Sequence, residues 1–194
     1  MINVTIRGTR PLIMQSDRLV DPLDPFSKQK AQAAKSKDKA TEAGQEKLGR
    51  LEFLGSLYLD EDSEPCIPQD NILRALRDAA AREKMGKTVR EQIVCDVDNF
   101  KLKYDGPRDA EKLYRDGRFV FRKSVANAGG QTRVMRTRPR FPVGWSLSFS
   151  LSIEGHRTLL AEDVLRFLNV AGPLGIGTWR PRYGGFVVES FEGS

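Results

Sequence analysis

Several short segments of the chain alternate hydrophobic with polar residues, which is the pattern of half-buried β-strands. The alternation is clearest at residues 2–6 and at residues 145–153, where every second residue from Trp145 to Ile153 is apolar. Shorter apolar runs bounded by turn residues predict further strands at 12–14, 55–59, 93–95, 100–104 and 119–121. The pattern therefore predicts a protein built largely on a sheet.

Two segments instead carry apolar residues at helical spacing. Residues 72–80 place five apolar side chains on one face, and Asp70 just before them is a candidate N-cap. Arg74 and Arg77 fall off this face, so they either meet a ligand or solvate the surface. Residues 164–171 form a second apolar helix face, with acids in its first turn and Gly172 predicted to end it.

Residues 27–47 contain Lys, Ala, Gln and Glu with almost no large apolar side chain. This composition fits either a solvent-exposed helix or a flexible excursion. The composition of the whole chain, 39% hydrophobic and 30% charged, is that of an ordinary soluble protein, and we expect a cytoplasmic one. We expect no membrane association, because no apolar run approaches the ~18 residues of a membrane helix and the N-terminus lacks an apolar signal-peptide core.

The cysteine and histidine content limits metal and cofactor chemistry. The chain has two cysteines and one histidine, too few for a zinc site of about four ligands. Cys66 and Cys95 are therefore predicted to be free, buried thiols in a reducing compartment. No Walker loop, serine elbow or thiol–histidine pair is present, so we expect no cofactor and no hydrolase or nucleotide chemistry.

Positive charge is concentrated in one stretch, residues 117–153. The stretch contains no acidic residue and seven basic ones: Arg118, Arg122, Lys123, Arg133, Arg136, Arg138 and Arg140. Since the net charge of the whole chain is +6 and that of this stretch is +7, the residues outside the stretch have a net charge of −1. Arg and Lys that neutralise phosphates supply most sequence-independent affinity for nucleic acid. The alternative is a solvated edge strand whose charge deters aggregation.

Within this stretch, Arg136, Arg138 and Arg140 are spaced two residues apart. In a strand such residues point to the same face, roughly 6.5–7 Å apart, close to the phosphate step of an extended single strand. The row could therefore follow a polynucleotide backbone. Pro139 cannot donate to a ladder, which places it at a strand end, edge or bulge.

Near the C-terminus a glycine-rich segment carries a second candidate site. It combines glycines with two arginines and two aromatic residues: Gly175, Gly177, Trp179, Arg180, Arg182 and Tyr183. Glycines allow a backbone to approach phosphates, and the aromatic rings could stack on bases. The alternative is a glycine-rich turn whose aromatic side chains fill the core. It is not a dinucleotide fingerprint, because it leads into a strand rather than a helix.

The acid–base candidates are few. Asp21 and Asp24, each before a proline, could serve general-base or metal chemistry, although Asp-Pro is also ordinary turn chemistry. The single histidine, His156, lies in a predicted turn with no partner arranged around it. A further connection, Asn127 to Gly130, is predicted as a hairpin tip.

Two motifs together resemble the RAMP superfamily, which includes the repeated backbone subunits of CRISPR effector complexes. The first is Pro65-Cys-Ile-Pro-Gln-Asp-Asn-Ile-Leu-Arg-Ala-Leu-Arg77, and the second is Gly175-Ile-Gly-Thr-Trp-Arg-Pro-Arg-Tyr-Gly-Gly-Phe186. With the first strand they cover about a third of the chain, in the order the family has.

The resemblance implies an α+β fold: a modified ferredoxin-like (RNA-recognition-type) antiparallel sheet with packed helices and inserted excursions. We expect one RAMP-like domain over 1–194, with a charged insertion at about 27–50 and a basic strand-rich insertion at about 86–140. The resemblance also implies that Arg74, Arg77 and the glycine loop lie near a bound strand, and that copies assemble head to tail. In some family members an aspartate after the first strand cuts target RNA, which would correspond to Asp21 or Asp24.

The sequence thus predicts non-enzymatic binding of single-stranded RNA or DNA through its phosphates, by a homo-oligomer or filament. A compact phage-borne relative that coats single strands fits as well as a CRISPR subunit. The alternatives are a RAMP-type endoribonuclease that uses a loop aspartate and a structural protein-interaction module without nucleic acid.

Overall fold

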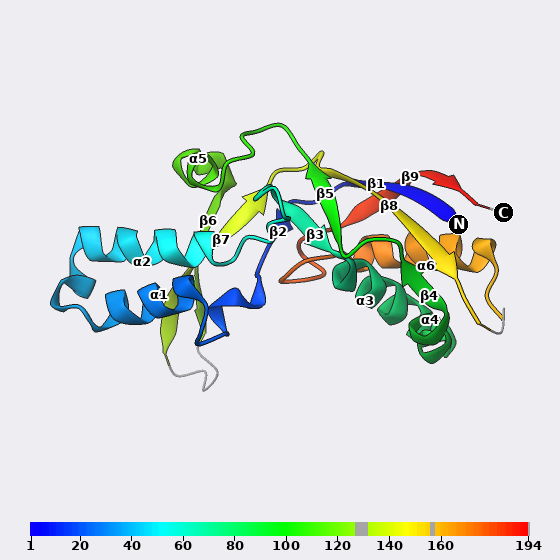
Figure 1. Ribbon diagram of the computed structural model, residues 1–194, viewed down its shortest axis with the longest axis horizontal. Helices are drawn as coiled ribbons and strands as arrows, with labels where there is room; N and C mark the ends of the chain where they lie inside the picture. Colours follow the sequence, from blue (N-terminus) through cyan, green and yellow to red (C-terminus); the bar gives the residue numbers. More distant parts are fainter. Residues whose placement is uncertain (127–131, 156–157, 194) are drawn as a thin grey trace. The chain divides into compact units, whose positions relative to one another are not determined.

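The computed structural model describes residues 1–126, 132–155 and 158–193. The chain divides into two compact units, which we describe separately. The first, residues 1–13, 59–105 and 141–194, is called the sheet unit. The second, residues 14–58 and 106–140, is called the hairpin unit. Figure 1 shows the helices and antiparallel strands of an α+β fold, as predicted.

The sheet unit contains seven of the strands within the described residues: β1 (Ile2–Gly8), β2 (Leu12–Ile13), β3 (Cys66–Pro68), β4 (Ile93–Cys95), β5 (Asn99–Lys103), β8 (Ser146–Ile153) and β9 (Phe186–Glu192). Its helices are α3 (Gln69–Ala80), the 3-10 turn Ala81–Glu83, α4 (Gly86–Gln92) and α6 (Ala161–Leu174). The main sheet has the order β3-β5-β8-β1-β9, and β4 also pairs with β8. All of its pairings are antiparallel.

The order of elements in this unit is that of a ferredoxin-like fold. The chain follows the β-α-β-β-α-β pattern. In order, the elements are β1, α3, the pair β4 and β5, β8, α6 and β9. The modification is in the second strand, which is split: β4 pairs with the C-terminal part of β8, and β5 with its start. The RNA-recognition-type sheet expected from the sequence is therefore present.

The alternating residues form the core beneath this sheet. β1 and β8 pair in register with Val4 opposite Phe149, and both side chains are buried. Helices α3 and α6 pack against each other on one side of the sheet, as Figure 1 shows. Most of the residues that the helical spacing predicted are buried, with Leu76 and Phe167 fully enclosed, but Leu73 and Leu165 lie at the margin of these faces and are only half-buried.

The hairpin unit holds α1 (Pro25–Lys35), α2 (Glu42–Leu54), α5 (Ala110–Arg115), β6 (Val120–Ala126) and β7 (Arg133–Phe141, whose last residue belongs to the sheet unit). Short 3-10 turns lie at Asp17–Leu19, Lys37–Ala40 and Gly117–Phe119. Helices α1 and α2 pack together, β6 and β7 form an antiparallel hairpin, and α5 packs on α2 through an edge contact of Tyr114 with Phe53.

The structure resolves the open question about residues 27–47, which form helices rather than a flexible excursion. Polar caps explain why so hydrophilic a segment folds. Asp24 Oδ1 accepts from the Phe26 N–H at 2.7 Å with Pro25 in the first turn, and Thr41 Oγ1 accepts from the Gly44 N–H at 3.2 Å.

Several local predictions were wrong. Residues 55–59 form no strand; only Leu59 makes an isolated bridge, because the preceding chain turns out of α2. Asp70 is not the N-cap, since α3 already begins at Gln69 directly after Pro68. Gly172 does not end α6, because its missing side chain lets the helix approach the Phe186 carbonyl and continue to Leu174. Helices α4 and α5 were not predicted.

The division into units differs in detail from the insertions predicted at about 27–50 and 86–140. The hairpin unit begins earlier, at Met14, and its second segment begins only at Gly106. Residues 86–105 belong to the sheet unit, where they supply β4 and β5. The predicted hairpin tip at Asn127 to Gly130, as well as His156, lies outside the described residues.

Both cysteines are free and buried, as predicted. Burial, with smaller contributions from nearby carboxylates, raises the pKa of each thiol to about 12. Neither thiol is therefore a reactive nucleophile at neutral pH. Among the helices of the described residues, none has the length and apolar character needed to cross a bilayer.

Candidate nucleic-acid interface

The glycine-rich segment after α6 forms a closed loop that is held by the chain just after β1. The Ile176 N–H donates to the Gly184 carbonyl at 3.0 Å, and the Gly184 N–H donates to the Pro11 carbonyl at 2.8 Å. The Thr178 N–H in turn donates to the Ile13 carbonyl at 3.0 Å. Gly184 has a positive φ, and a Cβ there would lie 1.8 Å from the Ile176 oxygen, so only glycine fits.

The Arg10 side chain joins the last turn of α6 to the middle of this loop. Its Nη2 donates to the Pro173 carbonyl at 2.6 Å and its Nη1 to the Pro181 carbonyl. The Arg10 carbonyl also accepts the indole N–H of the buried Trp145, which ties the residue to the core. Sequence reasoning missed Arg10, because a single arginine after a strand carries no periodic signal.

Asp78 of α3 stands among three arginines of the same unit. Arg180 from the loop donates to its Oδ2 at 3.0 Å, whereas Arg74 and Arg77 on α3 lie 3.8 Å and 3.5 Å from its carboxylate. One carboxylate thus serves three cations, so this cluster keeps a net positive charge. The Arg74 side chain stays 66% exposed, which leaves its guanidinium open to a ligand.

A pocket of about 530 Å³ opens beside this cluster. Arg74 and Arg82 line it from α3 and the turn after it, and Thr178, Trp179 and Arg180 line it from the loop. Arg82 is exposed and makes no hydrogen bond or ion pair with the residues that the structure describes. The pocket therefore combines cations with an aromatic ring, the pairing that single-strand binding uses.

The remaining loop side chains extend this basic surface. The Trp179 and Tyr183 rings lie with centroids 6.4 Å apart and planes tilted by 55°. Both rings are half-buried, so they are neither inside the core nor free of neighbours. Arg182 beside them is exposed, and within the described residues it has no acidic partner. We call Arg74, Arg82, Trp179, Arg180 and Arg182 the loop surface.

The arginine strand of the hairpin unit has a different setting. Arg136 and Arg138 on β7 both lie 3.1 Å from the same oxygen of Glu52, which is buried on α2. Lys30 of α1 reaches that oxygen at 3.0 Å. The other Glu52 oxygen accepts the Thr137 N–H at 2.9 Å, so the carboxylate sits at the edge of the strand between the two arginines.

These contacts decide the ionisation of Glu52. Burial alone would raise the pKa of its carboxyl group, but the Thr137 N–H and the charges of Lys30 and Arg138 outweigh it and hold the pKa below its ordinary value. The side chain of Arg138 is only 7% exposed and also donates to Ser56 Oγ at 3.1 Å. Arg136 and Arg138 therefore join β7 to α2, and Glu52 also joins α2 to α1 through Lys30.

The other basic residues of the hairpin unit vary in their exposure. Arg122 is exposed on β6, and Arg133 is exposed on β7, where it donates to Ser124. Lys123 lies opposite Arg136 in the ladder, and Arg118 pairs with Asp116 at 2.8 Å. The Nε atom of Arg140 is buried without a hydrogen-bond partner among the described residues. Contact of these residues with phosphate stays a prediction.

The acidic candidates are engaged in local structure. Asp24 caps α1 and pairs with Arg18 at 2.9 Å; burial would raise the pKa of its carboxyl group, but these partners hold it below its usual range. Asp21 Oδ1 accepts the Leu23 N–H at 2.8 Å, as in an Asx turn. Across the described residues, no three His, Cys, Asp or Glu side chains come together as a metal site would require.

The open face of the main sheet is polar rather than aromatic. RNA-recognition domains stack bases on aromatic side chains at the centre of this face. Here the central strands β1 and β8 present hydroxyl and amide groups: Thr5 and Ser148 hydroxyls lie 3.1 Å apart, and Ser150 donates to Asn3 at 2.8 Å. In the part of the chain that the structure describes, the central strands of this sheet therefore present no aromatic stacking platform.

Comparison with known proteins supports the fold. No protein-family model matches the sequence, and no curated protein matches it either. Among solved structures, the chain resembles one in a cryo-EM structure of type III-B Cmr-beta bound to cognate target RNA. The likeness covers 98% of this chain with a TM-score of 0.55 at 10% identity, and it spans 59% of that chain's length. It shows a shared fold.

Proposed function

We propose that this protein binds single-stranded nucleic acid through its phosphate backbone and that the loop surface is the main point of contact. The observation that carries the proposal is the pocket where Arg74, Arg82 and Arg180 meet Trp179. Guanidinium groups bind phosphate oxygens in a planar, bidentate manner, and an indole ring stacks on any base. The site thus suits a strand without favouring one sequence.

The shared fold supports RNA as the first ligand to test. The similar chain belongs to an assembly described as bound to target RNA. The polar open face of the sheet argues against base stacking of the RNA-recognition type, which directs attention to the loop surface. Single-stranded DNA offers the same phosphates, so the preference between RNA and DNA is an outcome of the test.

The test is fluorescence anisotropy with labelled single-stranded RNA and DNA of about 30 nucleotides, long enough for several sites. We expect Arg74→Glu/Arg82→Glu to weaken binding by about tenfold or more, since a hydrogen bond to a charged group is worth roughly 1.5–3 kcal/mol. Lys84→Glu/Lys87→Glu is the matched control. It reverses two exposed charges of the same unit that do not line the pocket.

Equal losses in both double variants would mean that net charge alone drives binding and would contradict a localised site. No binding of either polymer at low salt would refute the proposal and favour a protein-interaction module. We further propose that copies align along the strand. Sedimentation of the protein with the same RNA should then show several copies per strand, whereas a single copy at saturation would contradict alignment.

A further inference from the structure

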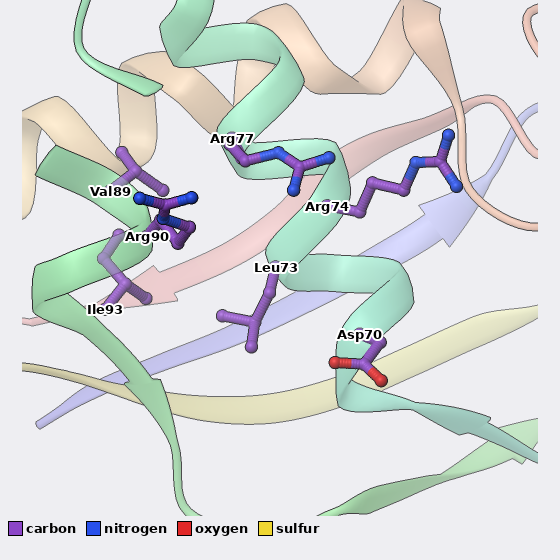
Figure 2. Close-up of a pocket in the computed structure, with 7 residues that line it drawn as sticks. All are labelled: Asp70, Leu73, Arg74, Arg77, Val89, Arg90 and Ile93. Atoms are coloured by element: carbon purple, nitrogen blue, oxygen red, sulfur yellow. The ribbon is translucent and has the colours of Figure 1, made fainter. Parts of the chain in front are cut away.

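A second pocket, of about 360 Å³, opens between α3 and α4 (Figure 2). Its floor is apolar: Leu73 from α3 and Ile93 at the start of β4 face each other, and Val89 of α4 lies beside them. Val89 and Ile93 are almost fully buried, whereas Leu73 is half-buried and open to an occupant. A flat apolar group, such as the face of a base, would cover this floor.

The rim of the same pocket is cationic. Arg77 and Arg90 lie on one side of Leu73 in Figure 2, and Arg74 points away toward the other side of α3. Arg90 is exposed and has no hydrogen bond or ion pair with the described residues, and the nearest acid to Arg77 is Asp78 at 3.5 Å. The Arg90 guanidinium is therefore unpaired within the described residues, and the Arg77 guanidinium, which also contacts Asp78, is the second cation at this rim.

The opposite end of the pocket carries a carboxylate. Asp70, Leu73 and Arg77 occupy successive turns of one face of α3, so Asp70 and Arg77 lie roughly 10 Å apart along the axis. Figure 2 shows Asp70 on the far side of Leu73 from Arg77 and Arg90. From one end of the pocket to the other, the lining therefore changes from cationic through apolar to anionic.

We infer that this pocket binds a single nucleotide whose base carries an amino group. The phosphate would lie on Arg77 and Arg90, which bind it as charged donors. The base would cover Leu73 and Ile93, and Asp70 would accept a hydrogen bond from the exocyclic amino group, as carboxylates do with cytosine. Uracil offers no such amino group, so adenine, cytosine or guanine is preferred. The nucleotide comes either from solution or from a strand.

Isothermal titration with AMP and UMP at millimolar concentration tests the first source. We expect AMP to bind more tightly than UMP, and Arg77→Ala/Arg90→Ala to weaken AMP by about tenfold or more, because each arginine contributes a charged hydrogen bond. Lys84→Ala/Lys87→Ala is the matched control and should leave AMP binding unchanged. Asp70→Asn should reduce the difference between the AMP and UMP affinities without loss of the phosphate contact, because the Asn amide also donates to uracil oxygens.

Competition separates the two sources. If the pocket takes a nucleotide of a bound strand, Arg77→Ala/Arg90→Ala weakens the binding of an A-rich strand more than that of a U-rich strand, and AMP competes with the A-rich strand. If it takes only a free nucleotide, AMP binds without affecting either strand. The inference is overturned if neither AMP nor either strand responds to Arg77→Ala/Arg90→Ala.

The same measurements distinguish this inference from the proposed function. AMP binding without strand binding would refute the proposed function and leave the nucleotide pocket standing. Strand binding that depends on Arg82 but not on Arg77 or Arg90, without AMP binding, would support the proposed function and refute the nucleotide pocket.

Discussion

The arginines of the sheet unit and those of the hairpin unit have opposite electrostatic settings. In the sheet unit Arg74, Arg77 and Arg180 share a single half-exposed carboxylate, Asp78. In the hairpin unit Arg136 and Arg138 share Glu52, which is almost completely buried. The first cluster can turn outward to a ligand at little cost, whereas the second cannot without leaving a charge buried and unpaired.

This difference shows that the density of arginine along a sequence does not reveal how those arginines are paired in the folded protein. The segment 117–153 is the most basic part of the chain, yet two of its seven cations are tied to a single buried carboxylate. The sheet unit carries fewer cations per residue but presents them around open pockets. What matters is which acid each arginine meets once the chain folds.

The largest effect is expected from Glu52→Gln. The substitution leaves Lys30, Arg136 and Arg138 without their shared carboxylate, so we expect a loss of about 3–5 kcal/mol in the free energy of unfolding of the hairpin unit. Urea denaturation measures it, with the exposed Glu46→Gln as control. A loss below 1 kcal/mol, roughly that of a surface pair, would contradict the comparison.

The same carboxylate gives a pH dependence with a definite sign. The pKa of Glu52 is lower in the folded protein than in the unfolded chain, so its contribution is present above the unfolded value of roughly 4.3. It is lost as the pH falls through the folded pKa. The stability difference between wild type and Glu52→Gln should therefore shrink in acid. A difference that grows as the pH falls would contradict the assignment.

The next largest effect is the difference in RNA binding between charge reversal on the loop surface and charge reversal on the β6–β7 hairpin. The exposed pair Arg122→Glu/Arg133→Glu reverses charge on the hairpin without touching Glu52. We expect it to weaken RNA binding by less than about threefold, a long-range effect that salt screens, compared with tenfold or more for Arg74→Glu/Arg82→Glu. Anisotropy at two salt concentrations compares the pairs, and a larger loss from the hairpin pair would reverse our assignment.

A smaller change is expected when an acidic residue of the hairpin unit other than Glu52 is replaced. Asp24→Ala removes the cap of α1 and the partner of Arg18, so we expect a loss of about 0.5–2 kcal/mol in stability. It should leave unchanged any cleavage of labelled RNA in the presence of Mg²⁺, because the carboxylate is committed to local structure. Cleavage by wild type that Asp24→Ala or Asp21→Ala abolishes would instead establish the endoribonuclease alternative.

The smallest expected effect has the opposite direction. Asp78→Asn removes the one acid that three arginines of the sheet unit share. We expect RNA binding to tighten by about threefold at low salt and by less at high salt, because the added positive charge acts through a screened field. Unchanged binding, checked beside an Asp98→Asn control elsewhere in the same unit, would place the strand away from this cluster.

Much of the sheet unit could be predicted from the sequence, because its signals are local. The alternation of β1 and β8 and the helical spacing of α3 and α6 each follow from the side on which a residue is buried. The ends of elements were harder to predict. Gly172 stays helical because β9 passes close to it, and that contact is not local in sequence.

The candidate site was only partly predictable, for the same reason. The glycines and aromatic residues at 175–185 marked the loop, the helical spacing singled out Arg74 and Arg77, and the resemblance implied that both lie near a bound strand. The burial of Arg138 depends on Glu52, a residue 86 positions earlier. Arg10 and Arg82 carry no sequence pattern, and only the folded chain places them beside the loop.

The most direct test of the central claim is to locate the bound strand on the protein. Ultraviolet cross-linking of single-stranded RNA, followed by mass spectrometry of the digested complex, identifies the side chains in contact with bases. We predict cross-links in the segment 175–185, at Trp179 or Tyr183, which Arg74→Glu/Arg82→Glu removes. Cross-links confined to β6 and β7 of the hairpin unit would contradict the account and restore the arginine strand as the binding track.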